Sequence, residues 1–357
     1  MRNFAKHFQV LAITLVFVLF SSSCSINPAL ETLNIYFIDV EGGQATLIIM
    51  PGGETLLIDA GYPGKGKSEP IPGDANSARD AQRIMAAAAD ANVSRIDYLL
   101  ISHFHTDHFG GAMELAQLIP IGTILDHGAE VQKSRSKPKQ LELILAYEEV
   151  REQSQYVVPS VGDRLPLKDV EITIVSSAGT VLEAPADDTE ENTFCDRPQL
   201  TPGKPSENAR STGILVRYGE FQLLNLGDLV GQPLSDLVCP TNRIGTVDVY
   251  LVPHHGIADA AAPATLAAFK PRVAILNNGA TKGGAASIFD VLHSAEGLED
   301  VWQLHLSENE GAENFSAARI ANLDTQTANW IKLSANTDGS FRILNGRTGE
   351  WNFYNAE

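Results

Sequence analysis

The stretch that most constrains the fold is Ser-His-Phe-His-Thr-Asp-His-Phe-Gly-Gly at 102–111, which directly follows an apolar run. The apolar run predicts a buried strand, so four potential metal ligands stand where that strand ends. Alternation along an extended chain places His103 and His105 on one side, and Asp107 and His108 follow where the chain turns toward the same space. Imidazole nitrogens and carboxylate oxygens suit Zn²⁺, with Mn²⁺ or iron as alternatives. The spacing therefore favours a metal site over a set of solvated histidines.

Other apolar and alternating runs predict further strands and helices. Strands are expected at 33–40, 44–50, 54–58, 96–101, 121–125, 156–158, 170–175, 213–218, 221–226, 247–252, 272–277 and 301–306. Helices are expected at 76–92, 111–118, 139–153, 262–269 and 286–294. A C-terminal β-rich extension is expected at 307–357, with a closing β element at 330–333, 341–344 and 351–354.

The order of these elements divides the chain into two halves, each a β-meander followed by alternating strands and helices. The second meander is expected to begin with 156–158 and 170–175. This order predicts an α/β protein in which two mixed sheets pack together with helices outside. We expect one domain over 25–357, interrupted by a long loop insertion at 177–210 that carries four prolines. A loop of that length is usually functional or disordered, so we expect a mobile insertion beside the active site.

Three shorter motifs also stand at predicted strand ends. Asp59-Ala-Gly closes the first meander, Gly-Asp at 227–228 closes a hairpin, and Pro-His-His-Gly at 253–256 follows a buried strand. Together with the motif at 102–111, they resemble the signature of the metallo-β-lactamase-fold hydrolases. That resemblance implies a four-layer αββα sandwich and a pair of metal ions, with zinc expected first.

The resemblance also implies a role for each ligand. His103 and His105 would hold the first metal, and the Asp228 carboxylate would bridge both metals. Asp107 would bind one metal and orient or shuttle a proton, so Asp107 and Asp228 are the expected catalytic residues. A metal pair can lower the pKa of a bound water and supply hydroxide near neutral pH.

The second metal would be held by His108 and by one of two adjacent histidines. Alignment on the His-Gly pair selects His255, whereas alignment on the strand end selects His254, and the sequence leaves both open. Asp59 is implied to orient the metal loop. It can also cap the strand end, and the two roles are compatible.

One departure from the resembled pattern concerns the number of histidine ligands. Many members supply another histidine before the bridging aspartate, but here no histidine occurs from 128 to 253. Asn208 occupies the corresponding stretch and is a poor zinc ligand, which leaves the number and occupancy of the metals open. His127 follows the strand at 121–125 and is expected either to line the pocket or to be a hydrogen-bonded strand-end residue.

Within the superfamily, the motifs most resemble the extracytoplasmic hydrolase domain of DNA-uptake competence proteins of the ComEC type. This resemblance alone implies phosphodiester or phosphate-ester substrates. An acyl hydrolase acting on a lactam, lactone or thioester is the alternative enzyme, and a non-catalytic metal-binding surface protein is the alternative class. The formal net charge of −18 disfavours nonspecific nucleic-acid binding, so a small-molecule or short oligomeric substrate is expected.

The first 24 residues have the pattern of a targeting segment and are excluded from the fold. Arg2 and Lys6 precede an apolar run, which ends in Ser-Ser-Ser-Cys24. This ending resembles a bacterial lipobox, although Ser21 stands where leucine is usual. The segment predicts an extracytoplasmic protein of the periplasm or cell envelope, with lipid anchoring through Cys24 as its membrane contact and plain secretion as the alternative.

Export bears on the two remaining cysteines, Cys195 and Cys239. In an oxidising compartment they could form a disulfide that ties the long loop to a later segment. Two unpaired buried thiols are the other expectation, and the sequence does not decide between them. It also does not indicate an oligomeric state.

Overall fold

The computed structural model describes residues 32–128, 138–183, 191–195, 206–258 and 263–356. The predicted leader at 1–24, including Cys24, lies outside the described residues. Within the described ranges, no helix has both the length and the apolar character needed to cross a bilayer.

The first sheet has nine strands in the order β17-β16-β15-β1-β2-β3-β4-β5-β6. Neighbouring strands are antiparallel from β17 to β3 and parallel from β3 to β6. Its strands are β1 Leu33–Phe37, β2 Thr46–Ile49, β3 Thr55–Ile58, β4 Ile96–Leu100, β5 Ile121–Leu125, β6 Gln155–Val157, β15 Ile331–Ala335, β16 Phe341–Asn345 and β17 Trp351–Tyr354.

The second sheet has eight strands in the order β14-β13-β12-β11-β10-β9-β7-β8. The strands from β10 to β14 are parallel, whereas β9, β7 and β8 pair in antiparallel fashion. Its strands are β7 Glu171–Ser177, β8 Thr180–Val181, β9 Gly213–Tyr218, β10 Phe221–Asn225, β11 Val249–Leu251, β12 Val273–Leu276, β13 Asp300–His305 and β14 Ile320–Asn322.

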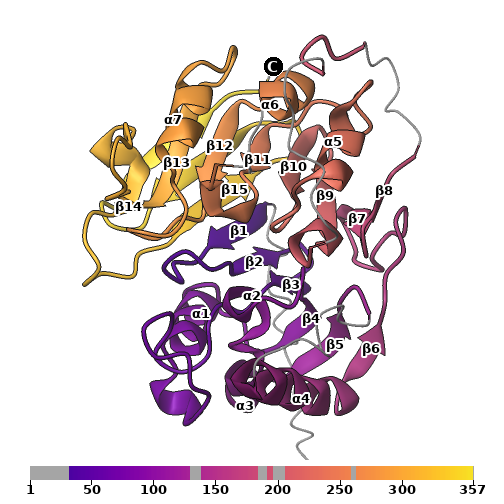
Figure 1. The fold of residues 1–357 in the computed structure, drawn as a ribbon, viewed down its shortest axis with the longest axis vertical. Helices are drawn as coiled ribbons and strands as arrows, with labels where there is room; N and C mark the ends of the chain where they lie inside the picture. The colour runs from indigo at the N-terminus through magenta and orange to yellow at the C-terminus, as the bar shows by residue number, and fades with distance from the viewer. Residues whose placement is uncertain (1–31, 129–137, 184–190, 196–205, 259–262, 357) are drawn as a thin grey trace, which may run out of the picture.

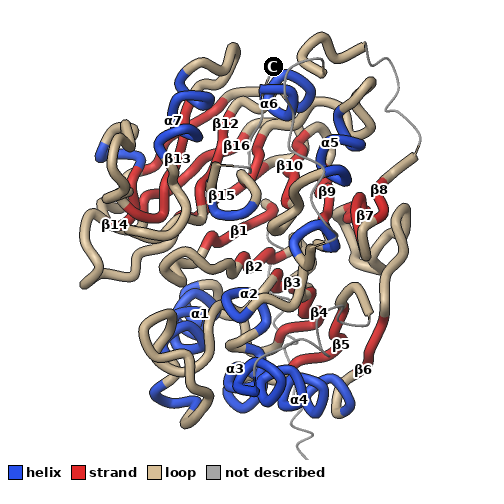
Figure 2. The backbone as a smooth tube through the Cα atoms, in the orientation of Figure 1, coloured by secondary structure: helices blue, strands red, loops and turns tan. Residues whose placement is uncertain are grey.

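Helices cover the outer face of each sheet (Figures 1 and 2). The first sheet carries the short 3-10 helix η1 Ala75–Ser77 and α1 Arg79–Asp90, α2 Thr106–Phe109, α3 Ala112–Leu118 and α4 Pro138–Glu152. The second sheet carries α5 Gln232–Val238, α6 Pro263–Phe269 and α7 Ala286–His293. The remaining 3-10 turns are η3 Asn208–Arg210, η4 His254–Gly256 and η5 Ala317–Arg319.

Three hydrophobic clusters correspond to the three interfaces between four layers. Alternate residues of β1 show how they form, because Leu33, Ile35 and Phe37 pack between the sheets while Tyr36 packs under the first helix layer. A third cluster fills the space between the second sheet and its helices. The predicted four-layer αββα sandwich of two mixed sheets is therefore confirmed.

Two strands expected side by side lie in different sheets. We expected 156–158 and 170–175 to open a second meander, but β6 pairs in parallel with β5 and β7 pairs with β9. Helix α4 connects β5 to β6 and returns the chain to the same end of the first sheet, which makes the parallel pairing feasible. Helix α5, which has seven residues, was not predicted.

The predicted insertion and extension both contribute strands to the sheets. Within the expected loop at 177–210, β8 adds an edge strand to the second sheet, so the loop is not entirely irregular. A disulfide joins Cys195 to Cys239 with a Cα–Cα distance of 5.7 Å, which ties this loop to the end of α5. Within the expected extension at 307–357, β14 joins the second sheet and β15 to β17 join the first.

Candidate metal centre

The candidate ligands converge at one rim of the sandwich, where strands of both sheets reach their carboxyl ends. Residues after β3 and β4 approach the rim from the first sheet, and residues after β10, β11 and β12 approach it from the second. Parallel neighbours end at the same edge of a sheet, so motifs far apart in sequence meet here. Figure 1 shows this rim between the two helix layers, with α2 beside it.

Two groups of side chains at this rim could each hold a metal ion. His103, His105 and Asp228 form the first group, and Asp107, His108, Asp228 and His255 form the second. Within each group the potential ligand atoms lie within 4.8 Å of one another. Asp228 belongs to both groups.

The Asp228 carboxylate occupies the centre of the cluster. Its Oδ2 lies 3.2 Å from His108 Nε2, 3.4 Å from His255 Nε2 and 3.7 Å from His103 Nε2. Its Oδ1 is buried and has no hydrogen-bond partner among the described residues. Two ring nitrogens, His103 Nε2 and His105 Nδ1, face each other at 3.0 Å. A buried carboxylate oxygen without a donor, surrounded by imidazoles, fits divalent cations better than it fits an internal hydrogen-bond network.

The two adjacent histidines point in different directions. His254, His255 and Gly256 all have positive φ, at 51°, 56° and 72°. Such backbone is costly for non-glycine residues and is concentrated at functional sites. The resulting turn directs His255 Nε2 to within 3.1 Å of Asp107 Oδ2, whereas His254 Nε2 lies 2.9 Å from Asn208 Nδ2 and 3.8 Å from Asp228 Oδ2. The geometry therefore places His255 in the second group and pairs His254 with Asn208.

Asp59 lies directly behind the metal loop. Its Oδ1 accepts a hydrogen bond from the Ser102 N–H at 2.7 Å, and its Oδ2 accepts one from the Ser102 hydroxyl at 2.8 Å. The same Oδ2 lies 2.7 Å from His108 Nδ1. This contact leaves the other ring nitrogen of His108 facing the cluster, which is what an orienting carboxylate does for a metal-binding imidazole.

His127 contacts a glutamate that we did not single out from the sequence. Its Nε2 lies 2.6 Å from Glu207 Oε1, and the same oxygen accepts the backbone N–H of Phe104, between the first two ligand histidines. Burial alone would raise the pKa of Glu207, but its hydrogen bond with His127 lowers it, and the net shift is downward. His127 is thus the hydrogen-bonded strand-end histidine, and Glu207 holds the metal loop through the Phe104 N–H.

Lys282 is a second residue that the sequence analysis missed. Its Nζ contacts the Asp107 carboxylate and lies 3.2 Å from the Tyr62 hydroxyl. Burial would lower the pKa of Lys282, but Asp107 raises it, so the amine is held as a cation. In turn, burial would raise the pKa of Asp107, but Lys282 and His108 hold it well below its usual range. The only feature of the sequence that points to Lys282 is the Gly-rich stretch that follows the strand at 272–277.

Two imidazoles of the cluster have pKa values that are shifted in opposite directions. Burial lowers the pKa of His103 well below its ordinary value, so that ring is neutral and ready to bind a cation. Burial would also lower the pKa of His108, but Asp228 and Asp107 raise it well above its ordinary value. A proton on His108 must leave before a metal can bind there, so binding at the second group releases a proton.

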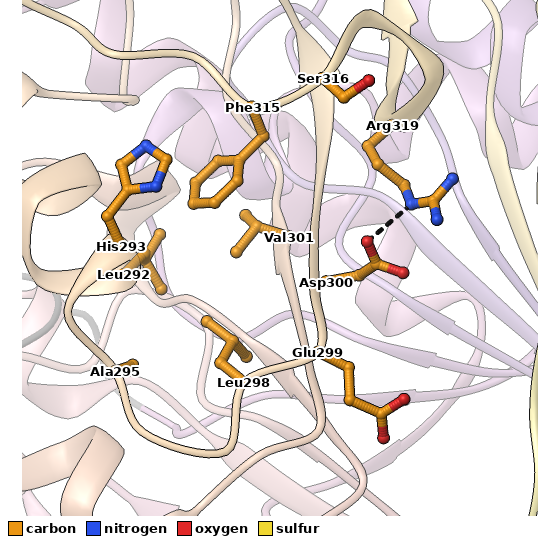
Figure 3. A pocket seen from close by; sticks show the side chains of 10 residues that line it. All are labelled: Leu292, His293, Ala295, Leu298, Glu299, Asp300, Val301, Phe315, Ser316 and Arg319. Atoms are coloured by element: carbon orange, nitrogen blue, oxygen red, sulfur yellow. Dashed lines mark hydrogen bonds and ion pairs between the residues drawn. The ribbon is translucent and has the colours of Figure 1, made fainter.

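A separate hollow of about 170 Å³ lies elsewhere (Figure 3). It is formed by the end of α7, the beginning of β13 and the segment before η5. Its lining residues are Leu292, His293, Ala295, Leu298, Glu299, Asp300, Val301, Phe315, Ser316 and Arg319, and none of them belongs to the candidate metal centre. Because β13 begins here, the hollow lies at the sheet edge opposite the rim.

Most of the chain matches one protein family. Residues 38–276 match the family model described as the metallo-beta-lactamase superfamily. No curated protein matches the sequence.

Solved structures with a similar fold are distant in sequence. The metallo-beta-lactamase fold protein YhfI from Bacillus subtilis is 10% identical, with 76% of this chain and 96% of that chain covered and a TM-score of 0.43. A mutant of the CmlA beta-hydroxylase, a diiron enzyme from Streptomyces venezuelae, is 16% identical, with 77% of this chain covered and a TM-score of 0.41. The match spans 53% of the CmlA chain. A metallo-beta-lactamase from Cronobacter sakazakii is 15% identical, with 62% and 75% covered and a TM-score of 0.38.

Proposed function

This chain belongs to the metallo-beta-lactamase superfamily, and from that premise we propose that it is an exported, metal-dependent hydrolase of phosphodiesters or related phosphate esters. The observation that carries the proposal is the convergence of two ligand groups on the shared, buried carboxylate of Asp228. Divalent cations bound there would supply Lewis acidity and lower the pKa of a water molecule. Zinc suits this mixed histidine and carboxylate set, and manganese or iron are the alternatives.

The side chains of this protein divide the remaining work. Asp228 would hold both groups in one geometry, and Asp59 fixes the His108 ring. Asp107, whose pKa lies well below its usual range, stays ionised and can accept a hydrogen bond from water or substrate. His103, His105 and His255 complete the ligand set.

Three features support the choice of substrate and compartment. The motif set resembles the hydrolase domain of ComEC-type proteins, which favours phosphodiester chemistry. The net charge of −18 disfavours long nucleic acids, so a small molecule or short oligomer is the proposed substrate. The leader pattern, together with the Cys195–Cys239 disulfide, favours the periplasm or cell envelope, because disulfides persist in oxidising compartments.

Metal analysis and a substrate panel test this function. We expect purified protein to carry stoichiometric zinc, manganese or iron and to hydrolyse bis-p-nitrophenyl phosphate but not nitrocefin. Asp228→Ala should lower the hydrolysis rate at least about 100-fold, because both ligand groups lose their shared member. Activity on nitrocefin alone would indicate an acyl hydrolase, and protein without stoichiometric metal would indicate a binding protein instead.

A further inference from the structure

The position of Lys282 is fixed by a tightly bonded loop after β12. The Gly279 N–H donates to the Lys282 carbonyl at 2.8 Å, which closes the loop on itself. The Gly284 N–H donates to the His255 carbonyl at 2.9 Å, which fastens the loop to the turn that carries a predicted ligand. Asn309 donates to the Gly283 carbonyl at 2.7 Å. The lysine is therefore built into the rim and is not a surface side chain that happens to reach it.

The turn at 41–43 encloses the loop from the other side. A Cβ added at Gly42 would lie 2.9 Å from the Lys282 Cβ, so the glycine permits a close approach that another residue would prevent. Gly42 also has a φ of 81°, in the left-handed region that favours glycine. The base of the lysine side chain is thus confined, and its ammonium group is directed at the second ligand group.

The ammonium group retains capacity for a further partner. A lysine has three N–H donors, and Lys282 makes two hydrogen bonds among the described residues, one to the Asp107 carboxylate and one to the Tyr62 hydroxyl. The side chain is 24% exposed, so part of it can be reached from solvent. One donor and the positive charge are therefore accessible to a ligand.

Charge balance indicates which kind of ligand this would be. Asp107 lies between Lys282 and the second ligand group, and Asp228 and Asp59 add two further carboxylates. With divalent cations in both groups, the positive charge of the metals and Lys282 would still exceed the negative charge of these three carboxylates. An anionic substrate group would supply that charge and accept the free N–H.

We propose that Lys282 binds an anionic oxygen of the substrate beside the bond that is cleaved, and so makes the protein selective for negatively charged substrates such as phosphodiesters. This inference rests on the proposed hydrolase function and adds a specificity residue to it. Tyr62 positions the ammonium group through its hydroxyl. Lys282 forms no covalent bond and transfers no proton in this role.

Lys332 offers a matched control for Lys282. It lies on β15, outside the rim, with its Nζ 3.5 Å from Asp90 Oδ2 and 4.7 Å from the centre of the Tyr36 ring. Both lysines therefore contact an aspartate and a tyrosine, but only Lys282 contacts a predicted metal ligand. The test compares zinc-loaded, full-length wild-type protein with Lys282→Met, Lys282→Arg and Lys332→Met.

The primary measurement is calorimetric binding of inorganic phosphate, with metal analysis of every variant. We expect Lys282→Met to weaken phosphate binding about 10- to 100-fold, the loss expected for one charge-assisted hydrogen bond, while the zinc content stays unchanged. Lys282→Arg, which keeps the charge, should retain most of the affinity, and Lys332→Met should match wild type. Unchanged phosphate affinity in Lys282→Met, or a matching loss of zinc, overturns the inference.

Hydrolysis separates this inference from the function on which it rests. In Lys282→Met we expect the KM for bis-p-nitrophenyl phosphate to rise, with no comparable change for neutral p-nitrophenyl acetate. An equal loss on both substrates would contradict a specificity role. If wild type cleaves no phosphate ester but its phosphate binding still depends on Lys282, the anion site stands and the proposed hydrolase function fails.

Discussion

At the scale of single residues, the two adjacent histidines after β11 should differ in what they do. His255→Ala removes a member of the second ligand group, so we expect that variant to lose about one metal per chain and most of its activity. His254→Ala should keep its full metal content, because His254 contacts Asn208. Metal analysis after dialysis distinguishes them, and equal losses in both variants would contradict the assignment.

Glu207 offers a second test at this scale, because it acts on the metal loop through the Phe104 N–H and His127. We expect Glu207→Gln to weaken zinc binding at the first group about 10-fold or more, since outer contacts orient the ligands. Competition with a chromophoric chelator measures this affinity. Glu171→Gln, which alters a surface contact with Arg217, is the control and should bind zinc as wild type does. An unchanged affinity in Glu207→Gln would show that its contacts do not govern the loop.

Some site residues could be identified from the sequence and others could not. The two sets differ in where their partners lie along the chain. His103, His105 and Asp107 stand in one short motif after a strand, so local spacing alone indicates a metal site. Glu207 and Lys282 have no such spacing, because their partners lie 103 and 175 residues away in the chain. Their function comes from the packing of one sheet against the other, which a single sequence does not display.

At the scale of elements, the first turn of α1 contains a buried carboxyl with a consequence for stability. Asp80 accepts the Tyr62 N–H at 2.7 Å and pairs with Arg79, yet burial raises its pKa from 3.8 to about 6. At a pH between these two pKa values, the Asp80 carboxyl stays protonated in the folded protein but is ionised in the unfolded chain. This contribution to stability is complete below about pH 4 and disappears as the pH rises through about 6.

Asp80→Asn tests this dependence. A difference of about two pKa units corresponds to about 3 kcal/mol, so the free energy of unfolding of metal-free wild type should fall by up to that amount, relative to Asp80→Asn, between pH 4 and pH 7. Denaturant titrations at several pH values give this difference. A difference that stays constant across the range would show that Asp80 titrates normally in the folded protein.

At the scale of the whole molecule, the sequence predicts the strands better than their pairing. The residue pattern within β1 or β15 indicates that each is a strand, and both are largely buried. It does not show that Leu33 pairs with Ala335, because that register depends on two ends of the chain meeting. The same limit explains why β6 and β7, expected in one meander, belong to different sheets.

The C-terminal strands should therefore be essential to folding and not an accessory. A deletion of residues 330–357 removes β15 to β17, which exposes the edge of β1 and takes Leu333 and Ile343 from the core between the sheets. An unpaired hydrophobic edge is prone to aggregate, so we expect this variant to be insoluble. A deletion of 350–357 removes only β17 and the Tyr354 hydroxyl contacts with Asp300 and Trp302, and it should stay soluble with reduced stability. Soluble, metal-binding protein from the longer deletion would contradict this expectation. It would show that the sandwich forms without β15 to β17 and that β1 tolerates an unpaired edge.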